Sequence, residues 1–332
     1  MPETETQTTR NTIDRLMGAI YSPMAMLAGL QLEVFTPLRD GPMDAASLAA
    51  KLDVRAEKLS PLLYALVVAE LLTVEDGVFA NTPESAQFLA KGAPGYMGGV
   101  HELLSDIWGA TFQTAETVRK GSPQAKHDFD AMSVEALRAF LRGLHGAAMG
   151  TGRYLAELLS LSRYRHLADV GGGSGGLAMG ACQACEGLRS TVVELPKTAT
   201  ITAEFIADAD MAERVTISPA DVTEEIPGRF DIAVLRALIQ VLSAEQAQRV
   251  ISNVGEALES GGTIAILGRM VDDSRTTPVR DVAFNLVFLN VYDDGRCYTE
   301  SEHRQWLDQA GFTEFKRQTL PDGTQMITAQ KG

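Results

Sequence analysis

The chain has 332 residues, of which 45% are hydrophobic and 22% are charged, and its formal net charge is −14. This composition is that of a soluble globular protein, and the acidity argues against nucleic acid as a partner. We recognise no signal peptide and no apolar run long enough to span a membrane, so we expect no membrane association and a cytoplasmic location. Three cysteines are too few for a disulfide framework, which also favours a reducing compartment.

The first part of the chain predicts a mostly helical domain with the element order of a winged helix. An apolar segment, Met17–Phe35, is followed by a helix that begins near Asp44 and by a second helix over Glu57–Leu72. A strand, turn and strand are then predicted in Thr73–Ala80. Because the second helix is mostly apolar and not basic, we interpret residues 1–95 as a dimerisation domain and not as a DNA-binding domain.

Residues 96–161 predict a helical linker with a break at Gly121–Pro123. Its side chains that suit a pocket are Trp108, Phe112, Arg142, His145 and Met149. Their helical spacing is equally typical of a hydrophobic core, and a lone histidine is more often structural than catalytic. Because the segment joins the helical domain to the one that follows, we expect its inner face to cover a ligand cleft.

A glycine-rich stretch, Asp169–Gly176, lies between a short apolar run and an alanine-rich helix. This order predicts a strand, a tight turn and a helix, with glycines that allow positive φ angles and a close approach of a ligand. Gly171, Gly173 and Gly176 match the dinucleotide pattern G-x-G-x-x-G. Asp169 extends it to D-x-G-x-G-x-G, a form that suits the cationic groups of S-adenosylmethionine. We therefore expect this cofactor, with a nicotinamide dinucleotide as the alternative.

Two further acidic residues follow the next two predicted strands. Glu194 ends the strand Thr191–Glu194, and Asp221 comes after the strand-like run Arg214–Pro219. Open α/β sheets bind ligands at the carboxyl ends of their strands, so Glu194 suits a ribose diol and Asp221 suits the adenine amino group. The cofactor-binding residues expected from the turn and these strand ends are Asp169, Gly171, Gly173, Gly175, Glu194, Asp221 and Val222.

Residues 162–332 predict an α/β domain with a Rossmann-like sheet of seven strands. The strands are expected at 167–170, 191–194, 215–218, 231–235, 263–267, 313–318 and 324–329. A turn at Gly261–Gly262 is expected before the fifth strand, and the last two strands form an antiparallel hairpin. Cys182 and Cys185 form a C-x-x-C inside a helix, which favours small buried residues over redox chemistry, and no cluster of residues has the spacing of a metal site.

Over its whole length the chain resembles the S-adenosylmethionine-dependent small-molecule O-methyltransferases of plants and bacteria. The resemblance rests on three motifs, Asp169–Gly175, Val193–Pro196 and Gln309–Phe312, together with the helical first half. It implies a homodimer in which the first helices of each subunit complete the partner's pocket. It also implies that the acids after the second and third strands hold the ribose and the adenine, and that Arg236 lies near the cofactor.

The chain departs from this family at the residues that handle the proton. After the fourth strand the family generally has a His-Asp pair, in which the histidine is the base that deprotonates a phenol. Here Gln240 stands at the histidine position and Val241 at the aspartate position. The acid that usually orients the histidine is replaced by Gly268. Because a carboxamide cannot accept a proton near neutral pH, this position supplies no general base.

A thioether sulfur has no proton to lose, so the missing base favours S-methylation by orientation alone. We expect a small thioether acid such as 4-methylthio-2-hydroxybutyrate, the substrate of the family's S-methyltransferases in dimethylsulfoniopropionate synthesis. O-methylation with another base, His145 first, and a non-methylating protein that retains the cofactor are the alternatives. The candidate catalytic residues are Gln240 and His145, and the candidate substrate-binding residues are Tyr21, Trp108, Phe112, Arg142, Met149, Arg269, Phe288 and Tyr292.

Overall fold

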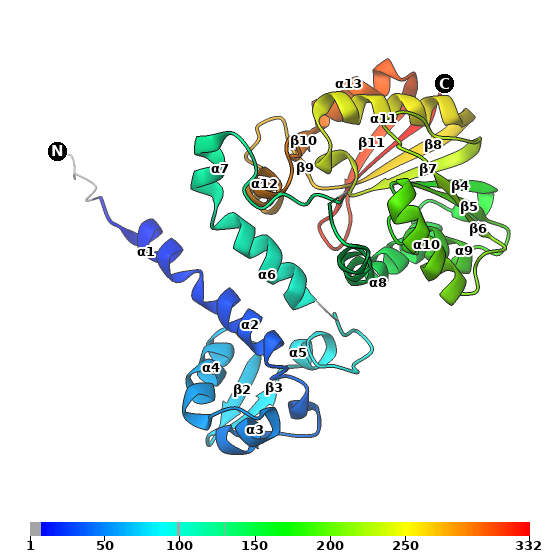
Figure 1. Ribbon diagram of the computed structural model, residues 1–332. Helices are drawn as coiled ribbons and strands as arrows, with labels where there is room; N and C mark the ends of the chain where they lie inside the picture. The colour runs from blue at the N-terminus through cyan, green and yellow to red at the C-terminus, as the bar shows by residue number, and fades with distance from the viewer. Residues whose placement is uncertain (1–7, 98–99, 130) are drawn as a thin grey trace, which may run out of the picture. The chain divides into compact units, whose positions relative to one another are not determined.

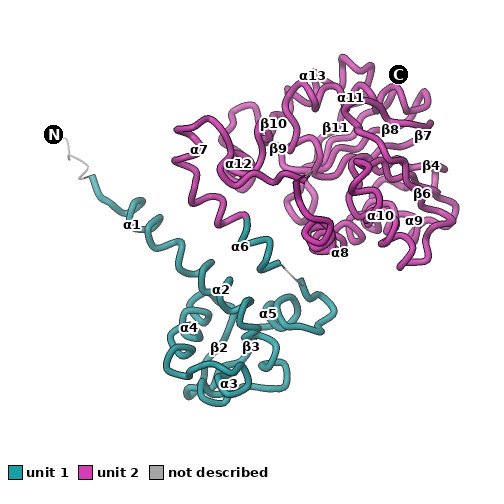
Figure 2. Tube along the Cα trace, in the orientation of Figure 1, with its two compact units in different colours: residues 1–106 teal, residues 107–332 magenta. Residues whose placement is uncertain are grey.

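The computed structural model describes residues 8–97, 100–129 and 131–332. The chain divides into two compact units, residues 1–106 and residues 107–332 (Figure 2). The boundary between them falls inside helix α6 (Val100–Thr111). The division into residues 1–95, 96–161 and 162–332 therefore stays a prediction.

The first unit contains the helices and the hairpin predicted from the sequence (Figure 1). Its elements are α1 (Asn11–Gly18), α2 (Tyr21–Gln31), η1 (Pro37–Arg39), β1 (Met43–Asp44), α3 (Ala45–Leu52), α4 (Ala56–Val68), β2 (Leu72–Glu75), β3 (Val78–Asn81) and α5 (Pro83–Phe88). The strands form one antiparallel sheet in the order β1-β3-β2. Helix α4 ends before the predicted Leu72, because Glu70 has a φ of 61° and the Leu71 N–H donates to the Leu66 carbonyl oxygen.

The second unit is built on a seven-stranded sheet with the order β11-β12-β8-β7-β4-β5-β6, which confirms the predicted fold. Its strands are β4 (His166–Val170), β5 (Arg189–Glu194), β6 (Val215–Pro219), β7 (Phe230–Arg236), β8 (Leu258–Gly268), β11 (Phe312–Thr319) and β12 (Gln325–Lys331). Neighbours from β8 to β6 are parallel, whereas β12 is antiparallel to both β8 and β11. Strand order reverses beside β4, where open sheets bind their ligands.

Helices cover both faces of this sheet. The helices of this unit after α6 are α7 (Thr114–Lys120), α8 (Val134–Leu158), α9 (Gly176–Ala184), α10 (Pro196–Asp208), α11 (Ala244–Ala257), α12 (Val279–Val291) and α13 (Glu300–Gln309), with short turns η2 (Leu161–Arg163) and η3 (Ile239–Val241). Of these, α7 packs against α12, where the Thr117 hydroxyl donates to Asn290. Alternate residues of the strands pack against α11 and α13 on one face and against α8 and α9 on the other. This double burial explains the nearly continuous apolar runs by which the strands were predicted.

The structure corrects two details of the predicted sheet. Strand β8 already begins at Leu258, so Gly261–Gly262 lies inside the strand and not in a turn before it. The register with β7 shifts between Phe230 and Ile232, and Gly261 has a φ of 76°, which are features of a bulge. A small parallel sheet of β9 (Met270–Val271) and β10 (Tyr298–Thr299) was not predicted, because two-residue strands have no periodicity to detect.

Helices α8 and α9 pack with their backbones in direct contact. A Cβ atom at Gly152 would lie 2.1 Å from the carbonyl oxygen of Leu177, and one at Gly180 would lie 2.2 Å from that of Met149. Gly176, the first residue of α9, similarly has the His145 carbonyl oxygen 2.9 Å from where its Cβ would be. The glycines of both helices therefore hold the middle of α8 against the glycine turn.

Candidate active site

The glycine turn joins β4 to α9 at the centre of the sheet. Gly173 has a φ of 56°, a conformation that a side chain would strain, and its N–H donates to Glu194. Gly172 is needed for space, because a Cβ there would lie 2.6 Å from the Asp169 carboxylate carbon. The turn therefore wraps closely around the buried Asp169 carboxylate and binds the Glu194 carboxylate at the carboxyl ends of β4 and β5.

Asp169 is the buried acid of this turn, with 1% of its surface exposed. Its Oδ2 accepts a hydrogen bond from the Ala178 N–H at 3.1 Å, which ties the end of β4 to α9. Burial raises the pKa of Asp169 to about 7, although the backbone hydrogen bond and the positive charge of Arg236 oppose this shift. A cationic ligand group at the turn would favour the ionised form of this carboxyl.

Glu194 ends β5 and faces the same turn. Its Oε2 accepts from the Gly173 N–H and its Oε1 from the Leu195 N–H, both at 2.8 Å. Burial raises the pKa of Glu194. A carboxylate has about four acceptor positions, so lone pairs remain for two hydroxyl groups of a ligand.

Asp221 and Val222 lie beyond β6, the next strand of the sheet. Asp221 is exposed, and its Oδ1 accepts from the backbone N–H and the hydroxyl of Thr223. Val222 is 8% exposed and belongs to the core below. Arg236, at the end of β7, is partly buried and donates from Nε to the Thr151 hydroxyl at 3.3 Å. Burial lowers the pKa of Arg236, while Asp169 acts in the opposite direction.

His145 lies on α8 beside the glycine turn. Its Nδ1 is 2.9 Å from the hydroxyl oxygen of Ser174, and its ring stacks on Phe205 at 4.8 Å. Burial lowers the pKa of His145, so the neutral imidazole dominates at neutral pH. On the same helix Arg142 is exposed and Met149 packs partly against the core below.

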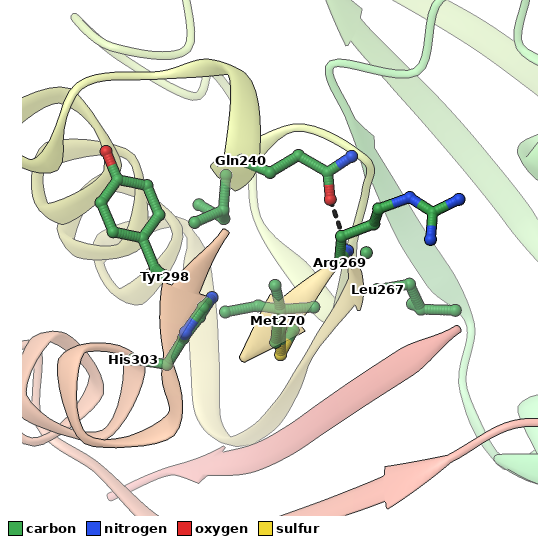
Figure 3. A pocket seen from close by; sticks show the side chains of 9 residues that line it. Gln240, Leu267, Arg269, Met270, Tyr298 and His303 are labelled. Atoms are coloured by element: carbon green, nitrogen blue, oxygen red, sulfur yellow. Dashed lines mark hydrogen bonds between the residues drawn. The ribbon is translucent and has the colours of Figure 1, made fainter. Parts of the chain in front are cut away.

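Gln240 lies on η3, directly after β7, where the family has its base. Its Oε1 accepts a hydrogen bond from the Arg269 N–H at 2.5 Å. Figure 3 shows the side chain extending away from Tyr298 and toward Arg269. Within the described residues the Gln240 Nε2 donates to no protein group. The carboxamide oxygen is thus engaged by the protein, and its two N–H groups are left for a ligand.

Gly268, the last residue of β8, lies directly against this carboxamide. A Cβ at position 268 would be 2.3 Å from Gln240 Oε1. A larger residue at 268 and the observed position of Gln240 therefore exclude each other. Ala237 lies between the two strand ends with a φ of 57°, an unusual conformation for a residue with a side chain, and its N–H donates to Leu267. The two departures from the family, Gln240 and Gly268, therefore depend on each other structurally.

Arg269 and Asp281 form an ion pair next to Gln240 that the sequence did not predict. Arg269 Nη1 lies 2.7 Å from Asp281 Oδ1, and the two side chains are 21% and 2% exposed. The guanidinium carbon is 4.0 Å from the ring centre of Phe284. Among the buried side-chain atoms that the structure describes, Asp281 Oδ2 has no hydrogen-bond partner. In the sequence this acid resembles an ordinary first-turn residue of α12, so nothing signalled its burial.

The remaining candidate substrate residues are spread over several elements. Phe288, on α12, and Tyr292, directly after it, have ring centres 6.1 Å apart, and Phe288 is 4% exposed and packs against Val271 and Cys297. Trp108 and Phe112 are half-buried and 71% exposed, respectively. Tyr21 belongs to the first unit, where it is 72% exposed. The structure therefore brings Arg269, Phe288 and Tyr292 into one region around α12, and it buries Phe288 in a small core.

A narrow crevice behind Gln240 contains the other histidine of this region, His303, and is lined by Gly268, Met270 and Tyr298 (Figure 3). It leaves no space for a ligand. His303 is 1% exposed, with Nδ1 at 2.8 Å from the Thr299 carbonyl oxygen, and burial lowers its pKa to about 4. A histidine enclosed in this way is a core residue and not a replacement base.

The described residues hold no group of three or more His, Cys, Asp or Glu side chains that could bind a metal ion. In the same part of the chain, no helix has the length and apolar character needed to cross a membrane. Cys182 and Cys185 are free and buried, and burial raises the pKa of Cys182 to about 11, which disfavours the reactive thiolate.

The comparisons with known proteins agree with this architecture. A dimerisation domain of O-methyltransferases matches residues 14–91, and an O-methyltransferase domain matches residues 111–313. The chain is 31% identical to the 3-hydroxy-5-methyl-1-naphthoate 3-O-methyltransferase of Streptomyces sahachiroi, covering 91% of this chain and 89% of the relative. It is 27% identical to the N,N-dimethyltransferase OxyT of Streptomyces rimosus, covering 96% and 95%.

A solved structure has the same fold over the whole chain. Human N-acetylserotonin methyltransferase, crystallised in complex with S-adenosylmethionine, aligns with a TM-score of 0.83 at 23% identity and covers 100% of both chains. The present chain belongs to the O-methyltransferase family and is a methyltransferase. The buried Asp169 and the acceptor positions of Glu194 fit S-adenosylmethionine, the cofactor predicted from the sequence.

Proposed function

We propose that this protein transfers the methyl group of S-adenosylmethionine to the sulfur of a small thioether acid. The observation that carries the proposal is the hydrogen bond from the Arg269 N–H to Gln240 Oε1. It leaves a hydrogen-bond donor, and no proton acceptor, at the position where the family has its base. An acceptor atom that carries no proton needs orientation only, and a thioether sulfur is such an atom.

The chemistry balances without a proton transfer. When bound, the cofactor supplies an electrophilic methyl group on a sulfonium. A lone pair of the substrate sulfur forms the new carbon–sulfur bond as the old one breaks, so one sulfonium is consumed and another is formed. Gln240 transfers no proton in this reaction. Its Nε2 hydrogens hold a polar group of the substrate beside the reacting sulfur.

The cofactor would be held by residues that the turn and the strand ends provide. Asp169 would face its cationic end, the backbone of Gly171–Gly175 would enclose it, and Glu194 would accept the two ribose hydroxyls. Asp221 and Val222 would flank the adenine at the end of the next strand. Arg236 stabilises the ionised form of Asp169, with which it interacts electrostatically. These roles agree with the burial and the free acceptor positions of the side chains.

The substrate carboxylate would bind to Arg269. One of its guanidinium nitrogens is used by Asp281, and the group is held over the Phe284 ring, so its orientation is fixed before a ligand arrives. A guanidinium has five N–H donors, which leaves several for a carboxylate. The backbone N–H that binds Gln240 Oε1 and the guanidinium belong to the same residue, Arg269. A short substrate therefore suffices to contact both Gln240 and Arg269.

O-methylation is the second candidate, and one observation favours it. His145 is neutral because burial lowers its pKa, and it lies at the glycine turn with Nδ1 on Ser174. A neutral imidazole can act as a general base for a phenol or an alcohol. The Streptomyces sahachiroi relative is named as an O-methyltransferase and the Streptomyces rimosus relative as an N,N-dimethyltransferase, so the acceptor atom varies among relatives of this chain.

The first unit would form a homodimer. Helix α1 has no buried residue, and the apolar side chains of Ile13, Leu16 and Met17 are at least 59% exposed. Tyr21 at the start of α2 extends this apolar surface. Exposed apolar faces of this kind mark protein interfaces, and the unit matches a dimerisation domain. We assign Tyr21 to the interface and to the edge of the pocket of the second subunit.

The proposal is tested by identifying the methylated product. Purified protein is incubated with isotopically labelled S-adenosylmethionine and either 4-methylthio-2-hydroxybutyrate or a panel of phenols, and products are analysed by mass spectrometry. A labelled sulfonium is the expected result. A methyl ether would replace this proposal by O-methylation. Cofactor binding without turnover on either set would favour a protein that retains the cofactor without methylating.

A further inference from the structure

The contact between Gly268 and Gln240 fixes the position of the Gln240 carboxamide. The carboxamide oxygen of Gln240 occupies almost the position that a Cβ of residue 268 would take, at a separation of 2.3 Å. The same oxygen accepts the Arg269 N–H at 2.5 Å. The backbone of residues 268–269 thus provides both the space and the hydrogen bond that fix the carboxamide. The space exists because Gly268 has no side chain.

We propose that Gly268 is a specificity-determining residue that acts through Gln240. By accommodating the carboxamide oxygen, Gly268 decides which face of Gln240 is presented to the acceptor: the N–H donors and not the oxygen. A side chain at 268 displaces the carboxamide, breaks its bond to Arg269 and removes the donor from the acceptor site. This inference deepens the proposed function and rests on it for the identity of the acceptor, whereas the coupling of the two residues stands on geometry alone.

The displaced group is the end of a flexible side chain and not backbone, so a Gly268→Ala variant is expected to fold. Gly268 is not among the glycines with positive φ, so alanine fits its backbone conformation. Apart from the Gln240 carboxamide, the nearest atom to the new Cβ is the Ala237 Cα at 3.9 Å, an ordinary contact. The effect of the substitution should therefore depend entirely on the side chain at position 240.

A double-mutant cycle tests this dependence. Four proteins are compared: wild type, Gly268→Ala, Gln240→Ala and the double variant. For each we measure the Tm of thermal unfolding and the kcat with the substrate that the product assay identifies. In the Gln240 background, Gly268→Ala should lower the Tm and reduce kcat by about 10- to 100-fold, because one well-placed hydrogen bond is lost. In the Gln240→Ala background, the same change should leave kcat within about twofold and leave the Tm equal or higher, since glycine is the poorer strand residue.

Two outcomes would overturn the proposal. If Gly268→Ala lowers Tm and kcat equally in both backgrounds, residue 268 acts without Gln240. If it changes neither quantity in the wild-type background, the carboxamide is not held as described. The Tm arm needs no substrate, so it tests the coupling even if the acceptor proves not to be a thioether. Ala265→Gly in the same strand serves as a control that should not be coupled to position 240.

Discussion

In the proposed site, the carboxyl ends of β4 and β5 form the cofactor side and those of β7 and β8 form the acceptor side, and the two sides differ in how they are built. On the cofactor side, backbone N–H groups of Gly173, Leu195 and Ala178 bind the carboxylates of Asp169 and Glu194. On the acceptor side, a carboxamide binds a backbone N–H and an ion pair is buried behind it. The sheet is regular under both sides, with parallel pairing of β7 and β8 up to Arg236 and Leu267.

Because the two sides are held by different groups, we expect substitutions on the acceptor side to leave the cofactor side intact. The turn needs glycines and acids at fixed places, because a ligand is held by the path of the chain itself. The acceptor side needs only compatible residues at positions 240 and 268, and these two positions can be changed without altering the turn. Perturbations of the two sides should therefore have separable effects.

The largest effect is expected from breaking the ion pair of the acceptor side. Asp281→Ala leaves the partly buried guanidinium of Arg269 without its partner, which should lower the free energy of unfolding by about 3 to 5 kcal/mol. Urea unfolding measures this loss. Glu116→Ala, which removes the two exposed ion pairs of Glu116 with Arg119 and Lys120 on α7, is the control and should have a much smaller effect because solvent screens them. Equal effects of both variants would mean that the Asp281 pair contributes no special stability.

On the cofactor side, Gly173→Val should weaken the binding of S-adenosylmethionine by about 100-fold or more. A β-branched residue at a φ of 56° is strained, and its Cβ would lie 3.4 Å from Leu141 Cδ2, so the turn has to change shape. Calorimetry measures the affinity. The control is Gly187→Val, at a position where a Cβ meets nothing within 4 Å, and it should bind normally. If Gly173→Val binds S-adenosylmethionine with unchanged affinity, the cofactor does not bind at this turn.

The affinity for S-adenosylmethionine should also depend on pH through Asp169. Its pKa in the free protein is raised to about 7, so below that pH the carboxyl is protonated and must release its proton to face a cation. The affinity should therefore fall by up to about tenfold per pH unit below 7 and level off above it. Titration calorimetry at several pH values follows this. Asp169→Asn should give a flatter profile, and an equally steep one would assign the proton to another group, Glu194 first.

A moderate effect is expected for Gln240→Ala, because a residue that only orients the substrate is not essential. We expect kcat to fall by about 10- to 100-fold while the affinity for the cofactor is unchanged. Steady-state kinetics with saturating cofactor give the two quantities separately. Gln240→Glu is the matched variant, since it keeps the size and the acceptor but replaces the donor. A loss beyond about 10⁴-fold in Gln240→Ala would show a direct part in the chemistry.

The smallest effect is expected at Ala237, which is strained at the end of β7. Ala237→Gly should raise the free energy of unfolding by about 0.5 to 1 kcal/mol, because the relief of the left-handed conformation exceeds the extra flexibility of the unfolded chain. Chemical denaturation measures it. Ala233→Gly, a buried position in the same strand, should be destabilising instead. A loss of stability in both variants would show that the φ of Ala237 is not a source of strain.

Most of the fold was predictable, because its signals are local. The buried strands of the sheet are continuous apolar runs, and the hairpin of the first unit has a turn between two short strands. The glycine motif and the acids after β5 and β6 were found for the same reason, since motif and strand end are neighbours in sequence. Strands β9 and β10, of two residues each, and the early start of β8 had no such signal.

On the acceptor side, the sequence predicted only which residues are missing and not how those present are arranged. The sequence showed that the expected base and its orienting acid were missing, but Gln240 and Arg269 are 29 residues apart, and their hydrogen bond is visible only in the folded chain. The burial of Asp281 and the contact of Gly268 with a carboxamide are likewise products of tertiary packing. Phe288, expected in the pocket, lies in a small core because helical spacing does not distinguish the two.

The central claim is that methyl transfer by this protein uses no general base, and the pH dependence of kcat/KM tests it most directly. The measurement uses the thioether acid as the varied substrate, with cofactor saturating at every pH so that the ionisation of Asp169 does not enter. A value that is constant between about pH 6 and 9 is the predicted result, because no group has to accept a proton. A rise with unit slope through one ionisation would contradict the claim and assign a general base, with His145→Gln as the variant that identifies it.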